Sequence, residues 1–254
     1  IYCGPPGMSL WQIAGVRQKT NVYTYFSQSD VRYYHNGRTA IREACKLLNL
    51  TVVDEVLVPS YNCGTEVEAL LNCGVSITFY RIDKSGAIDL DDIQKRISTK
   101  TKAIYIIHYF GFLQSIDSLK KICNEKGIFL IEDCALSLFS KYGNKINVGS
   151  VGDVAIFSFP KSLPVPDGGA LLVNNSHLVK DLKPLKNPDM LEIIRAQLPS
   201  VKSGFLRLIS RYGKMHRLSD RSTGSLHRLL FNSDAEIFHP IPSSYYYNDN
   251  LHSR

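Results

Sequence analysis

The chain has 254 residues, of which 44% are hydrophobic and 21% are charged, and its formal net charge is +7. These proportions are typical of a globular protein with one large core and exclude a disordered chain or a fibre. The longest apolar runs have the length of strands, so no membrane span is expected, and the first residues lack the features of a signal peptide. Six cysteines without a C-x-x-C pair favour reduced thiols in the cytoplasm over a disulfide scaffold or a zinc site.

Composition and patterning divide the chain into three regions. Residues 1–30 are rich in Gly, Pro and Tyr and are expected to be irregular, whereas residues 31–180 carry the regular pattern of strands and helices. Residues 181–254 are expected to be helical and basic, with seven basic residues and a single acid from Lys202 to Arg228. Such a segment suits a phosphorylated ligand, an acidic membrane surface, nucleic acid or simply a solvated helix face. It lacks the interleaved aromatic residues of a nucleic-acid reader, so we expect no nucleic-acid partner.

Short apolar runs alternate with segments of helical periodicity in the second region. Helices are predicted over 39–50, 66–72, 89–97 and 116–126, and strands over 55–59, 76–80, 103–107 and 128–131. This alternation predicts βαβ units and an α/β fold with a mainly parallel, mixed sheet sandwiched by helices. Ligands of such folds bind beyond the carboxyl ends of the strands.

Two strand ends carry an acid and a lysine. The run 128–131 ends in Glu132-Asp133, and a later apolar run, 154–159, ends in Pro160-Lys161. A lysine can form a Schiff base with pyridoxal phosphate, and an acid beside the pyridine nitrogen keeps that nitrogen protonated. Taken alone, Asp133 can equally be a helix cap or a buried hydrogen-bonded acid, and Lys161 a surface residue.

Further candidate ligands lie in turns near strand ends. The residues Asn36-Gly37-Arg38-Thr39 open a predicted helix, where free N–H groups and the helix dipole can seat a phosphate. Ser158 precedes Lys161 closely and can hydrogen-bond the same phosphate. His108 can contact a ring ligand, although a structural role is the favoured interpretation. Neither a G-x-G-x-x-G motif nor a P-loop is present, so no dinucleotide or nucleoside triphosphate site is indicated.

Five segments, in this order, resemble the DegT/DnrJ/EryC1/StrS family of pyridoxal-phosphate-dependent sugar aminotransferases. They are NGRTAI at 36–41, VPSYNCGTEVEAL at 58–70, AIYIIHYFG at 103–111, LIEDCA at 130–135, and GDVAIFSFPK followed by DGGAL at 152–171. The resemblance implies the fold-type I aminotransferase architecture and pyridoxal 5'-phosphate as the cofactor. It also implies a homodimer with active sites at the subunit interface, and a small C-terminal domain that is incomplete in 181–254.

The resemblance implies a role for each candidate residue. Lys161 corresponds to the Schiff-base lysine and Asp133 to the partner of the pyridine nitrogen. Cys63 stands where an aromatic residue often stacks on the cofactor ring, so Tyr61 or His108 is expected to take that role. The residues expected at the phosphate are Gly37, Arg38, Thr39 and Ser158.

The favoured interpretation is an aminotransferase that moves an amino group from an amino acid, with glutamate expected, to a keto-sugar. A nucleotide-linked sugar for polysaccharide or amino-sugar biosynthesis is expected, and the basic segment after Lys202 can contact its diphosphate. Two alternatives stay open. One is a pyridoxal-phosphate-dependent sugar dehydratase, against which Lys161 argues because dehydrating relatives carry histidine at that position. The other is a non-catalytic cofactor-binding regulator or assembly protein, which the departures from the family pattern at Cys63 and Leu136 favour.

Overall fold

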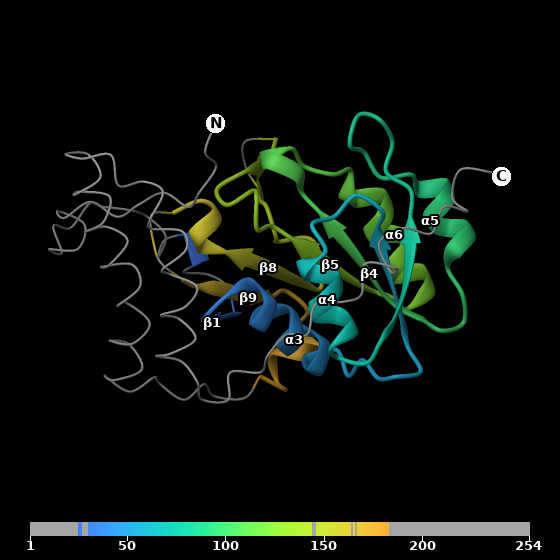
Figure 1. Ribbon diagram of the computed structural model, residues 1–254, viewed down its shortest axis with the longest axis horizontal. Coiled ribbons are helices and arrows are strands. Elements are labelled where there is room, and N and C mark those ends of the chain that lie inside the picture. Colours follow the sequence, from blue (N-terminus) through green and yellow to red (C-terminus); the bar gives the residue numbers. More distant parts are fainter. Residues whose placement is uncertain (1–24, 27–29, 144–145, 164, 166, 183–254) are drawn as a thin grey trace, which may run out of the picture. The chain divides into compact units, whose positions relative to one another are not determined.

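The computed structural model describes residues 25–26, 30–143, 146–163, 165 and 167–182. Within them a seven-stranded sheet has the order β1-β9-β8-β5-β4-β2-β3 (Figure 1). Its strands are β1 (Asp30–Tyr34), β2 (Glu55–Pro59), β3 (Ser76–Tyr80), β4 (Thr101–Ile107), β5 (Phe129–Asp133), β8 (Val154–Ser158) and β9 (Gly169–Val173). Only β9 runs against the other strands of this sheet, so the predicted α/β fold with a mainly parallel, mixed sheet is confirmed.

The helices cover both faces of the sheet. On one face lie α3 (Gly37–Leu47) and α4 (Thr65–Leu71), and on the other lie α5 (Leu90–Arg96) and α6 (Ile116–Lys126). A short helix, α7 (Ser176–Val179), follows β9, and a hairpin of β6 (Lys141–Tyr142) and β7 (Ile146–Asn147) lies apart from the main sheet. The four predicted helices are therefore present; α6 has the predicted bounds, and the ends of the other three are shifted by one to three residues.

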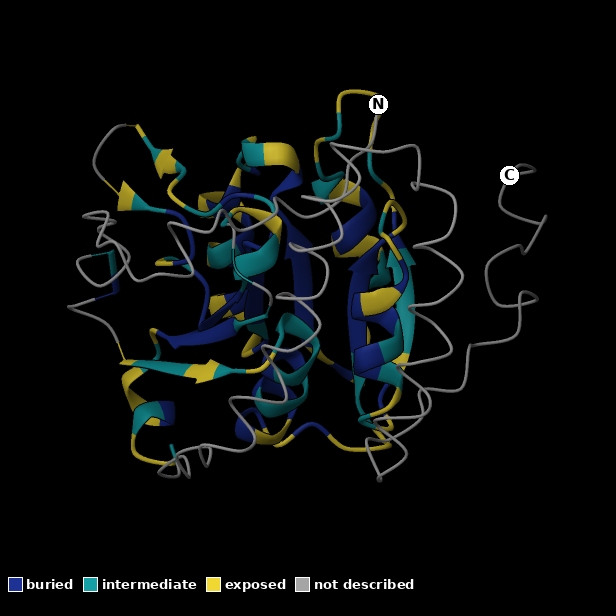
Figure 2. Ribbon diagram, turned by 60° about the vertical axis from the view of Figure 1, so that its left-hand side comes forward, coloured by how far each residue is buried: buried dark blue, intermediate teal, exposed yellow. Residues whose placement is uncertain are grey.

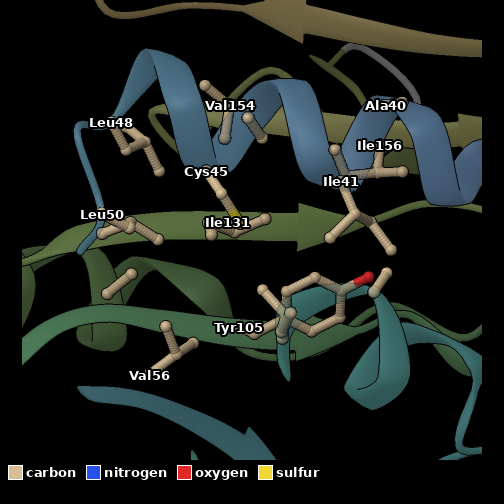
Figure 3. Close-up of a cluster of buried hydrophobic side chains, with 14 of the residues drawn as sticks. Ala40, Ile41, Cys45, Leu48, Leu50, Val56, Tyr105, Ile131, Val154 and Ile156 are labelled. Carbon is tan, nitrogen blue, oxygen red and sulfur yellow. The ribbon is translucent and has the colours of Figure 1, made fainter. Parts of the chain in front are cut away.

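The ends of α3 show why its predicted bounds, 39–50, were displaced. The helix begins two residues earlier because the Asn36 side chain accepts a hydrogen bond of 2.9 Å from the backbone N–H of Thr39 and so caps the first turn. It ends earlier because Asn49 adopts a left-handed backbone conformation with φ 51°. The apolar stripe between these ends faces the sheet, where Cys45 lies above Ile131 (Figure 3).

Alternation along the central strands divides their side chains between two layers. On β4, Tyr105 belongs to the cluster under α3 and α4, whereas Ile104 and Ile106 belong to the cluster under α5 and α6. Figure 2 shows these strands as the most completely buried part of the protein. On β5, Ile131 and Leu130 divide in the same way. The two acids that follow them therefore point to opposite faces of the sheet.

Two parts of the main sheet were not anticipated. β1 pairs with β9 in the register Tyr34↔Gly169, and this pairing places the start of α3 next to the end of β8. β5 extends to Asp133, beyond the predicted limit at Ile131, because its backbone continues to pair with β4 and β8.

The predicted terminal regions lie mostly outside the described residues. Of the N-terminal 1–30, Phe26 is buried against Phe157 at a ring-centroid distance of 5.1 Å. Of the predicted region 181–254, only 181–182 are described, so the basic segment from Lys202 to Arg228 lies outside the described part of the chain. No helix in the described ranges has both the length and the apolar character that a membrane crossing requires.

Candidate active site

One edge of the sheet gathers most of the predicted site residues. The strands β1, β2, β4, β5 and β8 run in the same direction, so their carboxyl ends meet at this edge. The turns that follow these ends and the ends themselves carry Gly37, Arg38, Thr39, Tyr61, Cys63, His108, Asp133, Ser158 and Lys161.

Asp133 ends β5 and is 7% exposed. Its Oδ2 accepts a hydrogen bond of 2.6 Å from the Tyr105 hydroxyl, and its Oδ1 accepts one of 2.9 Å from the backbone N–H of Ala135. Burial has the largest effect and raises the pKa of the Asp133 carboxyl, and the charge of Glu66 raises it further. The two hydrogen bonds and the charge of Lys161 lower this pKa. The net direction is a raised pKa, because burial outweighs the contacts that favour the ionised form.

Lys161 ends the short 3-10 turn η2 (Phe159–Lys161), which follows β8 directly. Its charge acts on the buried Asp133 carboxylate, because it lowers the pKa of that group. The fold thus brings the predicted lysine and acid within electrostatic reach of each other. Within the described residues the side chain of Lys161 is exposed.

The start of α3 lies against the end of β8. A Cβ atom added to Gly37 would lie 3.3 Å from the Cβ of Ser158 and 3.8 Å from its Oγ. A Cβ atom added to Gly169 would lie 2.7 Å from the backbone nitrogen of Gly37. The two glycines therefore allow three backbone segments to meet closely. The positive end of the α3 dipole and the Ser158 hydroxyl lie together, which suits a phosphate group.

Thr39, which is also predicted to bind the phosphate, is hydrogen-bonded to Asn36, the residue that caps α3. Its backbone N–H and its hydroxyl both donate to Oδ1 of Asn36, at 2.9 and 3.2 Å. Arg38, the second residue of α3, is half-buried beside it. The contribution of Arg38 and Thr39 to a phosphate site stays a prediction. For Thr39 it requires that the N–H or the hydroxyl that now donates to Asn36 also donates to the phosphate.

The two predicted cofactor-binding residues after β2, Tyr61 and Cys63, have different surroundings. Tyr61 is 56% exposed, and its ring centroid lies 5.2 Å from that of Tyr109, whose hydroxyl donates a hydrogen bond of 2.6 Å to the Tyr61 carbonyl. Cys63 is exposed as well, but its thiol donates a hydrogen bond of 2.7 Å to Oε2 of the buried Glu66. Tyr61 therefore offers an accessible aromatic face, whereas the thiol of Cys63 is held by Glu66.

His108 is fully buried on the side of the sheet that Glu132 occupies. Its Nδ1 accepts a hydrogen bond of 3.1 Å from the backbone N–H of Gln114. In the neutral ring Nε2 therefore carries the proton, and it lies 3.0 Å from Oε2 of Glu132 and 3.0 Å from the Tyr142 hydroxyl. Because both ring nitrogens have protein partners, the geometry favours the structural interpretation of His108.

Two residues near Asp133 escaped the sequence analysis. Tyr105 supplies the hydroxyl that holds Oδ2 of Asp133, and the buried Glu66 both raises the pKa of Asp133 and accepts hydrogen bonds from Cys63. A signal was present for Tyr105, because a hydroxyl inside the apolar run 103–107 needs a buried partner. No comparable signal existed for Glu66, whose first-turn position on α4 is typical of a solvated acid.

Glu132 organises the loop that crosses behind β5. Its Oε2 accepts a hydrogen bond of 3.1 Å from the backbone N–H of Gly149, and its Oε1 accepts one of 2.9 Å from Val151. The N–H of Gly152 also donates to Oε1. A fully buried carboxylate with this many donors is a structural anchor. The adjacent acids thus have separate tasks, since Asp133 faces the candidate site and Glu132 holds the scaffold.

The fold is that of the fold-type I aminotransferases. The putative sugar aminotransferase Spr1654 of Streptococcus pneumoniae, in its PLP-form, superposes with a TM-score of 0.63 at 20% identity, over 71% of this chain and 55% of that chain. The aminotransferase TlmJ of Streptoalloteichus hindustanus gives a TM-score of 0.62 at 22% identity, over the same shares of the two chains.

Residues 20–220 match the DegT/DnrJ/EryC1/StrS aminotransferase family, and the chain belongs to this family. A GDP-perosamine synthase of Vibrio cholerae is 35% identical over 148 residues, which are 58% of this chain and 40% of that protein. A UDP-N-acetyl-3-dehydro-α-D-glucosamine 3-aminotransferase of Acidithiobacillus ferrooxidans is 30% identical over 156 residues, which are 60% of this chain and 42% of that protein. The matched part spans less than half the length of each of these relatives.

Proposed function

We propose that this chain forms the cofactor-binding part of a pyridoxal-phosphate-dependent aminotransferase. Its amino donor is an amino acid, with glutamate the first candidate, and its acceptor is a keto-sugar linked to a nucleotide. The observation that carries the proposal is the placement of the buried Asp133 at the end of β5 and of Lys161 just after the end of the adjacent parallel strand β8, in this family's fold. The nucleotide-sugar names of the two relatives support the acceptor class.

The residues of the edge fit each part of this cofactor. The phosphate suits the start of α3 at Gly37 and the adjacent hydroxyl of Ser158. The protonated pyridine nitrogen suits the carboxylate of Asp133. Burial raises the pKa of this group, and a cation beside it favours its ionised form. The exposed amine of Lys161 suits the aldehyde. When bound, pyridoxal phosphate supplies a carbonyl that amines attack and a ring that accepts electrons from the substrate carbon.

The chain's own groups would then divide the work. Asp133 would hold positive charge at the ring nitrogen, and the Tyr105 hydroxyl would keep its Oδ2 oriented and ionised. Lys161 would carry the cofactor and, once displaced by a substrate amine, would move a proton to and from the substrate carbon. The exposed position of Lys161 leaves room for the entering amine.

A second subunit belongs to the same proposal. Phe110 is 66% exposed and Phe112 is 78% exposed, and both follow β4 at the edge that carries Lys161 and Asp133. Large apolar side chains at the rim of a site favour a covering surface, and a homodimer with active sites at its interface would supply one. The cytoplasmic location stays a prediction, which the five free thiols among the described residues support.

The test begins with covalent attachment in the full chain. Pyridoxal phosphate is added, the bound carbonyl is fixed with borohydride, and the modified peptide is identified by mass spectrometry. Lys161 is the expected site, Lys161→Ala should abolish the modification, and Lys102→Ala, which alters an exposed lysine of β4, should not. Modification at another lysine would overturn the assignment.

A second measurement separates an enzyme from a cofactor-binding regulator. Glutamate is added to the loaded protein, and the absorption of the bound cofactor is followed together with the release of 2-oxoglutarate. An aminotransferase should release one equivalent of 2-oxoglutarate for each bound cofactor. A stable spectrum without release, at saturating glutamate, would indicate a regulator.

A further inference from the structure

The turn that joins β2 to α4 is held by a buried carboxylate. Glu66, in the first turn of α4, is 5% exposed. Its Oε1 accepts a hydrogen bond of 3.0 Å from the backbone N–H of Cys63, and its Oε2 accepts one of 2.7 Å from the thiol of the same residue. The hydroxyl of Thr65 donates to this Oε2 at 3.1 Å. Three donors from two residues therefore converge on one side chain.

This carboxylate stands in for a helix cap. The N-cap residue of α4 is Gly64, which has φ 82° and makes no side-chain cap bond. The N–H of Gly64 donates instead to Oδ1 of Asn62 at 2.9 Å, and the Asn62 amide donates to the Pro59 carbonyl at 2.9 Å. Asn62 thus fixes the first half of the turn and Glu66 the second half. A buried carboxylate is costly unless it is hydrogen-bonded, so the burial of Glu66 and the shape of the turn depend on each other.

The turn lies at the sheet edge that carries Asp133. β2 is parallel to its neighbour β4, and β4 is parallel to β5, so the residues after β2 follow the same edge. The hydroxyl of Tyr109, which follows β4, donates a hydrogen bond of 2.6 Å to the Tyr61 carbonyl and joins the two turns. α4 covers the face on which Tyr105 holds Asp133, because its apolar side chains and Tyr105 belong to one core cluster. The charge of Glu66 raises the pKa of Asp133, which agrees with this placement.

Cys63 is exposed on this turn, although its N–H and its thiol are both bound to Glu66. We propose that Glu66 is a positioning residue of the cofactor site, and that the turn it holds, residues 60–64, forms one wall of the space for the cofactor ring. The thiol donates its proton inward to Glu66, so a polarizable sulfur without a proton of its own to offer remains on the exposed side, and such an atom suits the face of an aromatic ring. This inference rests on the proposed function, because it takes the ring to be that of pyridoxal phosphate.

The test uses the thiol of Cys63 as a reporter in the full chain. Pyridoxal phosphate is fixed to the protein with borohydride, iodoacetamide is added, and mass spectrometry of the peptides gives the alkylation rate of each cysteine. The fixed cofactor should slow the alkylation of Cys63 about tenfold, because the ring covers the sulfur. Cys73, which follows the opposite end of α4, should keep its rate.

Two matched variants then test the role of Glu66. Glu66→Gln replaces an acceptor by N–H groups that face the Cys63 thiol and the Thr65 hydroxyl, so the turn should loosen and the slowing should fall to about two- to threefold. Glu68→Gln removes the same charge two residues further along α4 and should leave the slowing complete. Because the cofactor is fixed covalently in each protein, a difference in occupancy does not enter the comparison.

The absorption of the bound cofactor, recorded before fixation, separates positioning from general stability. Glu66→Gln should move the absorption maximum and weaken binding about tenfold, as expected for the loss of hydrogen bonds to a charged group. Glu68→Gln should change neither value. A purely structural role of Glu66 would lower the urea midpoint of unfolding and leave the absorption maximum in place.

Two results would overturn the proposal. One is an alkylation rate of Cys63 that is the same with and without the fixed cofactor in the unaltered chain, which would show that the turn does not border the ring. The other is a Glu66→Gln variant with the slowing and the absorption maximum of the unaltered chain. The first result holds even if the variant fails to fold. A lack of attachment at Lys161 would instead refute the proposed function, so the two failures are distinguishable.

Discussion

The hydroxyl of Tyr105 donates a hydrogen bond of 2.6 Å to Oδ2 of Asp133 across the β4–β5 pair. Tyr105 lies opposite Ile131, so the two polar side chains are diagonal neighbours on one face of the sheet. Burial and the charge of Asp133 raise the pKa of Tyr105 far above its ordinary range, so the phenol remains a donor. This one bond sets both the orientation and the ionisation of the acid that the proposed function needs.

Tyr105→Phe should weaken pyridoxal phosphate binding about five- to tenfold, because a buried carboxylate loses a donor worth about 1–1.5 kcal/mol. The dissociation constant is measured by titrating the cofactor absorption. Tyr80→Phe is the matched control, since it also removes a buried tyrosine hydroxyl. That hydroxyl donates a hydrogen bond of 2.9 Å to the Tyr105 carbonyl and none to Asp133. Equal weakening in the two variants would show that general loss of packing, and not the Asp133 contact, is responsible.

Asp133→Asn should change how the stability of the cofactor-free protein depends on pH. The folded-state pKa of Asp133 lies above its ordinary value of 3.8, so folding favours the protonated form. Its stabilising contribution is complete below the unfolded pKa and is lost as the pH rises through the folded pKa. Relative to the variant, the unaltered chain should therefore lose unfolding free energy as the pH rises above about 4.

This difference is measured by urea unfolding at a series of pH values. The asparagine can still accept from Ala135 and donate to Tyr105, so the variant is expected to fold. A difference in stability that is independent of pH would contradict the predicted titration of Asp133.

Glu132→Gln should cost about 3 kcal/mol of unfolding free energy. The amide would present N–H groups to a site where His108 and three backbone N–H groups already donate. Glu43→Gln is the control, because Glu43 pairs with the exposed Lys46 at 2.7 Å and such a pair contributes less than about 1 kcal/mol. Urea midpoints of the two variants give the comparison, and similar losses would argue against Glu132 as the anchor.

Gly169→Ala should be more harmful than Gly37→Ala. The added methyl group would lie 2.7 Å from the backbone nitrogen of Gly37, and backbone cannot move aside easily, so a cost of about 1–3 kcal/mol is expected. At Gly37 the nearest atom is the Cβ of Ser158, at 3.3 Å, and a small shift can relieve the contact. Thermal unfolding measures both effects. Equal melting temperatures would show that β9 does not press on the start of α3.

The strands β2 to β5 could be predicted because they are short apolar runs between helical segments. β2 and β3 have the predicted bounds 55–59 and 76–80. β1, with the sequence DVRYY, escaped prediction because an edge strand needs little apolar alternation. It forms because the backbone N–H and C=O groups of β9 pair with it. These groups are in position only after the rest of the sheet has assembled.

The acid and the lysine at two strand ends, and Gly37 in the turn at the start of α3, could be recognised in the sequence because local residue types and strand periodicity specify them. Only the tertiary structure decided that Asp133 and Glu132 divide between two faces and that Tyr105 holds Asp133. These relationships depend on strand register and on helix packing between segments that are distant along the chain. Such segments come together because they bury a shared core, and the residue pattern of either segment alone does not show which partner it will meet.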